Sequence, residues 1–273
     1  SLSLTNYYKS EALMSVRNSS QNQSMLAQYG GLASLAGINL PASSDEKAMA
    51  VIELVKSRGF VKHLLTFENI LPSIMAPGSY DTNTKELVFN KRIYDSETKT
   101  WKRKPKNNSQ NKPSYLEVHH EYMGSLVSVS QDKVSGFVSI QVEHISPIFA
   151  KEFLELIIRE ANMLSRNSDM EESSEALEYL KSELSKTSFV EIRESINALI
   201  EAQLEKQMLT QINEDYILVE IDPPFISEEK SRPSRALICI IGTILGGILS
   251  SLIVLIRHYS MDGDEKNNNN ASI

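Results

Sequence analysis

Apolar residues recur at helical spacing through a long stretch of the chain that contains neither glycine nor proline. This stretch lies between Pro147 and Pro223. Apolar side chains three and four positions apart predict amphipathic helices, because 3.6 residues make one turn. Its second half carries one apolar stripe, which we assign to a core or an oligomer contact. The stripe residues are Ile192, Ile196, Leu199 and Leu204.

Two polar stretches interrupt this helical pattern. Residues 165–174 read SRNSDMEESS, in which Ser168 and Asp169 can cap a helix. Residues 185–190 read SKTSFV, and serine, threonine and β-branched residues favour a turn or a strand over a helix. We favour a hairpin of two helices that turns at 185–190, and a break at 165–174 is the alternative.

Alternating or β-branched segments flank the helical stretch on both sides and predict strands. The predicted strands are 5–16, 126–130, 136–144 and 216–221. The predicted additional helices are 23–35, 45–65 and 113–126. We therefore expect an α+β fold: a small α/β base with a long helical extension. The first and last strands would share one sheet next to a membrane, and the helices would project away from it.

A membrane helix is predicted near the end of the chain. Residues 236–256 read ALICIIGTILGGILSSLIVLI and contain no charge. At 1.5 Å per residue they would span about 31 Å, close to the thickness of the hydrocarbon core of a bilayer. Small residues four positions apart allow close packing of two membrane helices. The small residues assigned to such packing are Gly242, Gly246, Gly247 and Ser250.

This segment divides the chain into four parts. We expect a base with its helical extension over 1–222, a linker over 223–235, the membrane helix over 236–256 and a short disordered tail over 257–273. The linker prolines are Pro223, Pro224 and Pro233. Lysine and arginine residues flank the start of the membrane helix, and by themselves they weakly favour a cytoplasmic base.

Composition and charge exclude some classes of protein. The 273 residues are 41% hydrophobic with a net charge of −7, which is too apolar for a disordered chain. A single cysteine excludes a disulfide framework and a cysteine zinc cluster. Residues 147–215 carry seven Lys/Arg against fifteen Asp/Glu. Residues 85–112 have the opposite charge, with nine Lys/Arg against three Asp/Glu.

The basic segment also contains Trp101, in the run KTWKRKPK. A basic loop with an aromatic residue can bind nucleic acid or anionic lipid. We favour a solvated loop, or a surface that pairs with the acidic helices of a neighbouring copy. No nucleic-acid partner is therefore predicted.

The sequence contains no recognisable catalytic set. His119, His120 and Glu121 form HHE, but no second ligand cluster has useful spacing and HExxH is absent. His63 and His144 are isolated in apolar contexts and are interpreted as core or rim residues. No GxSxG, P-loop or GxGxxG occurs. We predict no enzyme activity, no catalytic residue, no metal site and no cofactor, which favours a scaffold or regulator.

Four segments resemble the Wzz-type chain-length determinants, the polysaccharide co-polymerases of the bacterial inner membrane. YKSEALM (8–14) is similar to the strand that leaves the first membrane helix of that family, and QYGGLASLAGINLP (28–41) to the segment after it. AVIELVKSRGFVKHLL (50–65) is similar to a family helix with a central Lys-Ser-Arg. Residues 223–247 resemble the proline-rich approach to the second membrane helix. A first membrane helix would lie upstream of residue 1.

The resemblance implies an inner-membrane protein whose main domain is periplasmic and assembles into a ring-like homo-oligomer. It places the short tail over 257–273 in the cytoplasm, against the weak signal of the flanking charges. It implies a role without catalysis: setting the chain length of O-antigen or a related glycan made by a Wzy-type polymerase. The implied partners are further copies, that polymerase, the membrane and a lipid-linked glycan.

Two other functions fit parts of the sequence. The adaptor subunit of a capsule or exopolysaccharide tyrosine-kinase export system would share this architecture. The short tail here has neither a Walker motif nor a tyrosine cluster, so the kinase would be a separate chain. A coiled-coil adaptor of an efflux or secretion machine would need a lipoyl-like β domain. The predicted strands are too few and too short for one.

Overall fold

A computed structural model describes residues 5–17, 44–104, 110–212, 216–234, 239–241 and 243–253. The chain divides into two units. The larger unit is Tyr7–Lys230, and the second comprises Ser1–Asn6 and Ser231–Ile273. The larger unit contains a mixed fold of helices and strands with one very long helix.

The main sheet of the larger unit brings together strands from both ends of the sequence. Four of its five strands are β1 (Tyr7–Val16), β6 (Val127–Gln131), β7 (Val138–His144) and β8 (Leu218–Asp222). They follow the order β6-β7-β1-β8, and each neighbouring pair is antiparallel. The prediction that the first and last strands lie in one sheet is therefore confirmed, as is the predicted hairpin of β6 and β7.

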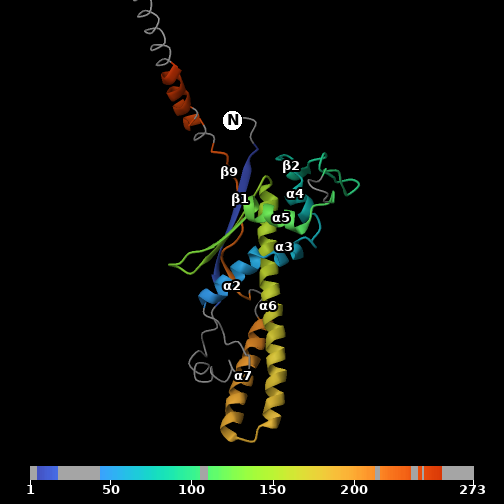
Figure 1. Ribbon diagram of the computed structural model, residues 1–273, viewed down its shortest axis with the longest axis vertical. Helices are drawn as coiled ribbons and strands as arrows, with labels where there is room; N and C mark the ends of the chain where they lie inside the picture. The colour runs from blue at the N-terminus through green and yellow to red at the C-terminus, as the bar shows by residue number, and fades with distance from the viewer. Residues whose placement is uncertain are drawn as a thin grey trace, which may run out of the picture. The chain divides into compact units, whose positions relative to one another are not determined.

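The strand directions define two ends of the base. Tyr8 at the start of β1 lies opposite His144 at the end of β7, which we call the proximal end (Figure 1). Val16 at the other end of β1 lies opposite Leu218. Because β8 is antiparallel to β1, the chain that leaves β8 heads back towards the proximal end. The short strand β9 (Lys230–Arg232) follows at the boundary of the two units.

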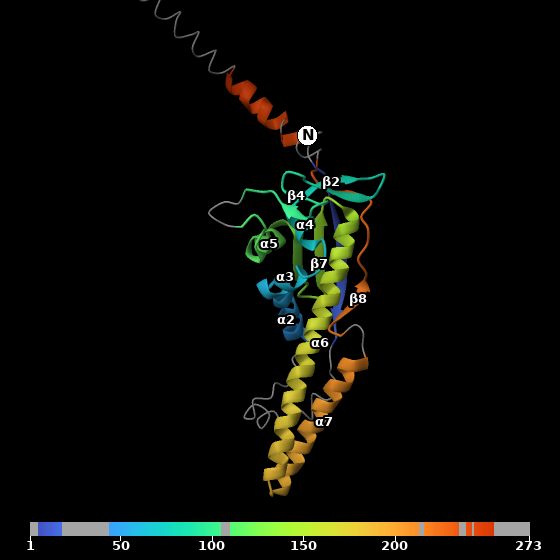
Figure 2. The same cartoon turned by 90° about the vertical axis from the view of Figure 1, so that its right-hand side faces the viewer.

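A two-helix hairpin extends away from the proximal end. The helix α6 (Pro147–Lys186) has 40 residues, which corresponds to about 60 Å, and α7 (Val190–Ile212) returns beside its second half (Figure 2). Ser146 caps α6 by accepting a hydrogen bond from the backbone N–H of Phe149. The predicted turn at 185–190 is confirmed, whereas α6 continues without a break through 165–174.

Two apolar clusters hold this unit together. The main core lies between the sheet and its helices, where the first half of α6 buries Leu154, Ile157 and Ala161. A separate small cluster lies between α6 and α7 in the extension, where Leu180 contacts Ile196 and Leu199. Since the two clusters share no member, the packing of the extension is separate from that of the base.

Short helices cover the sheet in the base. They are α2 (Ser44–Lys56), α3 (Arg58–Leu64), α4 (Ile70–Met75), α5 (Tyr115–Glu121) and the π-helical turn η2 (Tyr122–Leu126). The predicted helix 45–65 is divided at Ser57, whose side chain accepts a hydrogen bond from Phe60 N and caps α3. The predicted helix 113–126 corresponds to α5 and η2. The predicted helix 23–35 lies outside the described residues.

Two small hairpins occupy the region that we expected to be a solvated loop. They are β2 (Pro77–Asp81) with β3 (Glu86–Phe89), and β4 (Tyr94–Asp95) with β5 (Thr100–Trp101). The loop prediction is therefore wrong for residues 85–101. An aromatic cluster explains the order of these hairpins: Tyr94 is buried, and its ring centroid lies 4.9 Å from that of Trp101 and 5.6 Å from that of Phe89.

Three hairpin turns share one local chemistry. Asp81, Asp95 and Asp132 each accept two backbone N–H bonds through Oδ1, from the residues two and three positions later. The residue four positions after each aspartate has a positive φ, namely 59° at Lys85, 51° at Lys99 and 74° at Gly136. The pattern Asp-x-x-Thr/Ser-Lys/Gly is visible in the sequence. The first two turns are hard to predict from the sequence because lysine, not glycine, occupies the position of positive φ.

Candidate functional site

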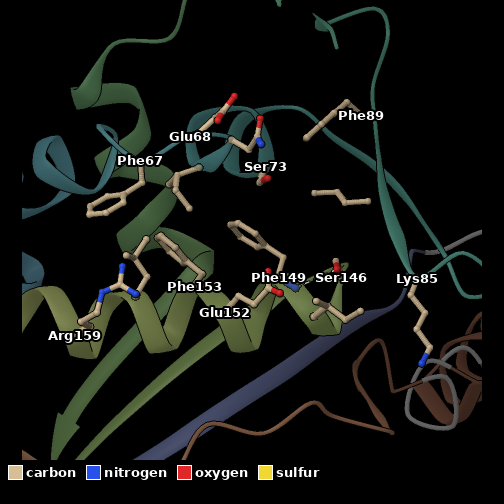
Figure 3. A pocket seen from close by; sticks show the side chains of 15 residues that line it. Phe67, Glu68, Ser73, Lys85, Phe89, Ser146, Phe149, Glu152, Phe153 and Arg159 are labelled. Carbon is tan, nitrogen blue, oxygen red and sulfur yellow. Dashed lines mark hydrogen bonds between the residues drawn. The ribbon is translucent and has the colours of Figure 1, made fainter. Parts of the chain in front are cut away.

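A cleft lies near the proximal end, between the first turns of α6 and the segment from α4 to β3 (Figure 3). Its volume is about 520 Å³. Phe149 and Phe153 form its apolar wall, with ring centroids 5.2 Å apart and planes inclined by 11°. Lys85 lines the cleft from the segment that precedes β3, and Arg159 lines it from α6. The cleft therefore combines aromatic faces with cations.

Several polar groups of this cleft have structural partners. The Ser146 hydroxyl accepts the helix-capping bond from Phe149 N, and the Ser73 carbonyl accepts a bond from His144. Glu68 pairs with Lys99 at 2.7 Å. Among the described residues, no hydrogen bond joins a serine hydroxyl of the cleft to a histidine or carboxylate. The described residues of the cleft could bind a ligand, but they do not form the nucleophile–base pair that covalent catalysis needs.

His144 is buried at the end of β7 and is fixed in one tautomer. Its Nδ1 accepts a hydrogen bond from Ser146 N at 3.1 Å, so Nε2 carries the proton and donates to the Ser73 carbonyl at 3.0 Å. Burial lowers the pKa of His144 to about 4, although the bond to Ser73 opposes this effect. His144 is therefore a neutral core residue at pH 7, as predicted.

His63 joins α3 to α6 through a buried carboxylate. Glu160 is only 3% exposed, and its Oε2 lies 2.8 Å from His63 Nε2. Arg159 Nε donates to the other oxygen at 3.1 Å. Both carboxylate oxygens thus have partners, which a buried charge requires. The pair of His63 and Glu160 joins α3 to α6.

The HHE segment does not form a metal site. His119 Nε2 lies 2.8 Å from the carbonyl of Lys56, and His120 is exposed on α5. Within the part of the chain that the structure describes, no group of three or more histidine, cysteine, aspartate or glutamate side chains is placed to hold a metal ion. HHE therefore serves as part of a surface helix, with His119 tying α5 to the end of α2.

The structure divides the predicted apolar stripe of α7 into two sets. Ile196 and Leu199 are buried, with 8% and 3% exposure, and face α6. Ile192 and Leu204 are 43% and 45% exposed. A hairpin of two helices can bury only one side of each helix, so the wider stripe leaves apolar side chains on the surface of the single chain. The assignment to a core is wrong for Ile192 and Leu204, whereas an oligomer contact through them stays a prediction.

The predicted membrane segment belongs to the second unit. Residues 236–238, 242 and 254–256 of it lie outside the described residues, and this includes Gly242. Gly246, Gly247 and Ser250 are helical, and a Cβ added at either glycine would meet no atom within 4 Å. Over the part of the chain that is described, no helix has both the length and the apolar character needed to cross a membrane.

The predicted linker has no regular secondary structure from Pro223 to Glu229 and contains β9 after it. Pro224 is buried, Pro223 is exposed and Pro233 is half-buried. Phe225 and Ile226 beside them are 47% and 50% exposed. The larger unit ends at Lys230, so the boundary between the two units falls inside the predicted linker 223–235.

Three cations of the basic segment form ion pairs within the same chain. Lys102 pairs with Asp95 at 2.6 Å, and Arg103 pairs with Glu117 at 2.8 Å. The Arg103 guanidinium, together with the backbone N–H of Ser114, lowers the pKa of Glu117 to about 2. These pairs, and that of Lys99 with Glu68, tie the hairpins to the base. Sequence reasoning did not identify them because the partners lie outside the basic segment or in its turns.

The likeness that comparison with known proteins finds is structural. No family model matches the chain, and no curated protein matches it. Among solved structures, a fragment of WzzB, a polysaccharide co-polymerase from Salmonella Typhimurium, is similar to this chain with a TM-score of 0.32 and 12% sequence identity. The match covers 83% of this chain and 100% of the fragment. A TM-score of this size does not establish a shared fold.

Proposed function

We propose that this chain is a non-catalytic regulator of polysaccharide chain length. It would act as an oligomeric scaffold beside a Wzy-type polymerase that makes lipopolysaccharide O-antigen. The proposal includes anchorage in the bacterial inner membrane by residues 236–256, with the base and its helical extension in the periplasm. A lipid-linked glycan would be the growing chain whose length the scaffold limits.

The observation that carries the proposal is the topology of the larger unit. β1 and β8 are neighbours in one sheet; the chain enters β1 at the proximal end and leaves β8 towards that same end. Between them, α6 and α7 form an extension that leaves the base in the opposite direction (Figure 2). The four segments that resemble the Wzz family imply this arrangement: a base held at the membrane by both ends of the chain, with helices that project away from it.

The chemistry of the base supports a scaffold rather than an enzyme. Its buried histidine and carboxylate have structural partners: His144 bonds Ser73 and Ser146, and Glu160 bonds His63 and Arg159. A length regulator needs an extended surface, assembly into many copies and anchorage in the membrane. The exposed apolar side chains of α7, such as Leu204 and Met208 at 45% and 62% exposure, are suited to contacts between copies.

Matched variants of α7 test this proposal in a strain from which the gene has been deleted. Ile196→Asn places an amide in the buried contact between α6 and α7 and should cost about 1–3 kcal/mol of folding free energy. Leu204→Asn changes an exposed side chain and should alter the free energy of unfolding by about 0.5 kcal/mol or less. We expect both variants to broaden or lose the modal glycan length, Ile196→Asn through unfolding and Leu204→Asn through lost assembly.

The measurement is a lipopolysaccharide ladder gel at matched protein level, with urea unfolding of each purified variant. Glu201→Asn, at an exposed position of the same helix, is the control and should keep the wild-type ladder. A wild-type ladder from both Ile196→Asn and Leu204→Asn would contradict the proposed role of the helical extension.

A further inference from the structure

The hairpins β2–β3 and β4–β5 carry an excess of positive charge. Residues 77–104 contain seven Lys/Arg against four Asp/Glu. Three of the cations form the ion pairs described above. The other four are exposed and have no ion-pair partner among the described residues, and we call them the unpaired cations. They are Lys85, Lys91, Arg92 and Lys104.

These cations stand on an ordered support. Asn90 N donates to the Ala76 carbonyl at 3.0 Å, which fixes the turn that carries Lys91 and Arg92. Lys102 N donates to the Ile93 carbonyl at 2.9 Å and joins the second hairpin to the same turn. The buried ring of Tyr94 packs between the two hairpins. Because the backbone is held in this way, the unpaired cations form a surface rather than a loose chain.

The surface lies at the proximal end of the base. The ring of Tyr80 in β2 contacts that of Tyr8 at the start of β1, with centroids 6.4 Å apart. In both views, β2 lies at the end of the larger unit opposite α7 (Figures 1 and 2). The hairpins are therefore next to the place where the chain enters the larger unit, and at the end towards which the chain runs after β8.

The covalent chain limits how far this end can be from a membrane. The larger unit ends at Lys230, and the apolar segment begins at residue 236. The residues 231–235 between them can span at most about 18 Å when fully extended. If residues 236–256 lie in a bilayer, the proximal end is held within about two Debye lengths of the lipid headgroups at physiological salt. This distance is an upper limit, so the linker also allows the cations to come within one Debye length of the headgroups, where anionic lipid attracts them.

We propose that the unpaired cations dock the proximal end of the base onto an anionic lipid surface. This inference rests on the proposed membrane anchorage. Each lysine or arginine near such a surface strengthens binding about fivefold. Trp101, which is half-buried, belongs to the same hairpins, and tryptophan favours the interface between lipid and water. Docking would hold the helical extension at a fixed angle to the membrane, as a scaffold for a growing glycan requires.

The single tryptophan of the chain reports directly on this surface. Trp101 is half-buried in β5, so energy transfer from tryptophan to dansyl-labelled lipid headgroups measures how close the hairpins lie to the bilayer. The full chain is reconstituted into vesicles of phosphatidylcholine alone, or of phosphatidylcholine mixed with phosphatidylglycerol. We expect greater transfer in the anionic vesicles, and a decrease as sodium chloride is added.

Two triple variants separate local from general charge effects. Lys85→Gln/Lys91→Gln/Arg92→Gln removes three unpaired cations and should weaken docking about a hundredfold. The control variant Arg58→Gln/Lys133→Gln/Lys181→Gln also removes two lysines and one arginine, but from exposed positions elsewhere in the larger unit. This control should keep the wild-type transfer and its dependence on salt.

The outcomes distinguish this inference from the proposals on which it rests. Flotation of the vesicles on a density gradient measures membrane anchorage separately from energy transfer. If the chain floats with both kinds of vesicle but energy transfer is independent of lipid charge, the docking surface is wrong and the membrane anchor stands. If the chain floats with neither, anchor and docking both fail. Equal losses of energy transfer from the two triple variants would also overturn the inference. Binding of the chain's cations to a soluble acidic polymer, without docking on the anionic vesicles, would overturn it as well. Control of glycan length is read separately, from the ladder gel.

Discussion

Acidification should destabilise this fold through His144. The neutral imidazole donates to the Ser73 carbonyl and accepts from Ser146 N, so protonation of Nδ1 breaks the second bond and buries a charge. Burial lowers the pKa of His144 to about 4, whereas an unfolded chain has an ordinary histidine pKa of about 6.5. The folded state therefore binds fewer protons than the unfolded state between these values, and its stability falls as the pH falls.

The size of the effect follows from these two pKa values. Integration from pH 7 to pH 5 gives a loss of about 2 kcal/mol in the free energy of unfolding. The full loss, reached below pH 4, is about 3 kcal/mol. Since small proteins are stable by only about 5–15 kcal/mol, a loss of this size is readily measured.

The assay is urea unfolding of the full chain in detergent, followed by circular dichroism at pH 7 and pH 5. His144→Gln keeps an N–H donor in the side chain but does not titrate, so its stability should fall by about 2 kcal/mol less than that of the wild type over this interval. His120→Gln changes an exposed histidine and should keep the wild-type dependence on pH. If wild type and His144→Gln lose the same free energy between pH 7 and pH 5, this reasoning is refuted.

Two further pairs of variants test the local structure by urea unfolding. A Cβ at Gly78 would lie 2.7 Å from the Val88 carbonyl oxygen, so Gly78→Ala should destabilise the fold by about 1–3 kcal/mol. A Cβ at Gly59 in α3 would have Ser57 Oγ at 3.8 Å as its nearest atom, so Gly59→Ala should be neutral or stabilising by up to about 1 kcal/mol. Equal losses in the free energy of unfolding from Gly78→Ala and Gly59→Ala would contradict the packing of β2 on β3. Gly136→Ala should cost about 1 kcal/mol because φ is 74°, whereas Lys99→Gly should stabilise its turn because φ is 51°; the opposite order would show that backbone strain does not govern these turns.

Much of the architecture could be predicted from the spacing of apolar residues and from the positions of glycine and proline. The absence of glycine and proline after Pro147 predicted the long helices, and the burial of alternate residues along β7 matches its predicted strand. The turn between α6 and α7 lies at 187–189, because the residues there are poor helix formers. The polar stretch 165–174 stays helical, since tertiary contacts such as that of Ser173 with Gln203 at 3.0 Å satisfy its side chains.

Other features depend on contacts that no local pattern reveals. The hairpins of the basic segment were missed because lysine occupies positions of positive φ at which glycine would have indicated a turn. A stripe of period 3.6 shows which side of α7 is apolar but not how much of that side a single neighbour covers, so the exposure of Leu204 could not be predicted. The cleft beside α6 is formed by residues from 67 to 159, which only the folded chain brings together.

The most direct test of chain-length control is an exchange of this chain between strains that keep their own polymerase and glycan. The gene replaces the length regulator of a strain whose O-antigen has a different modal length, and the lipopolysaccharide ladder is read at matched protein level. If this chain sets the length, the modal length follows the introduced gene and disappears when the gene is deleted. A ladder that is the same with the introduced gene and after its deletion would contradict the account.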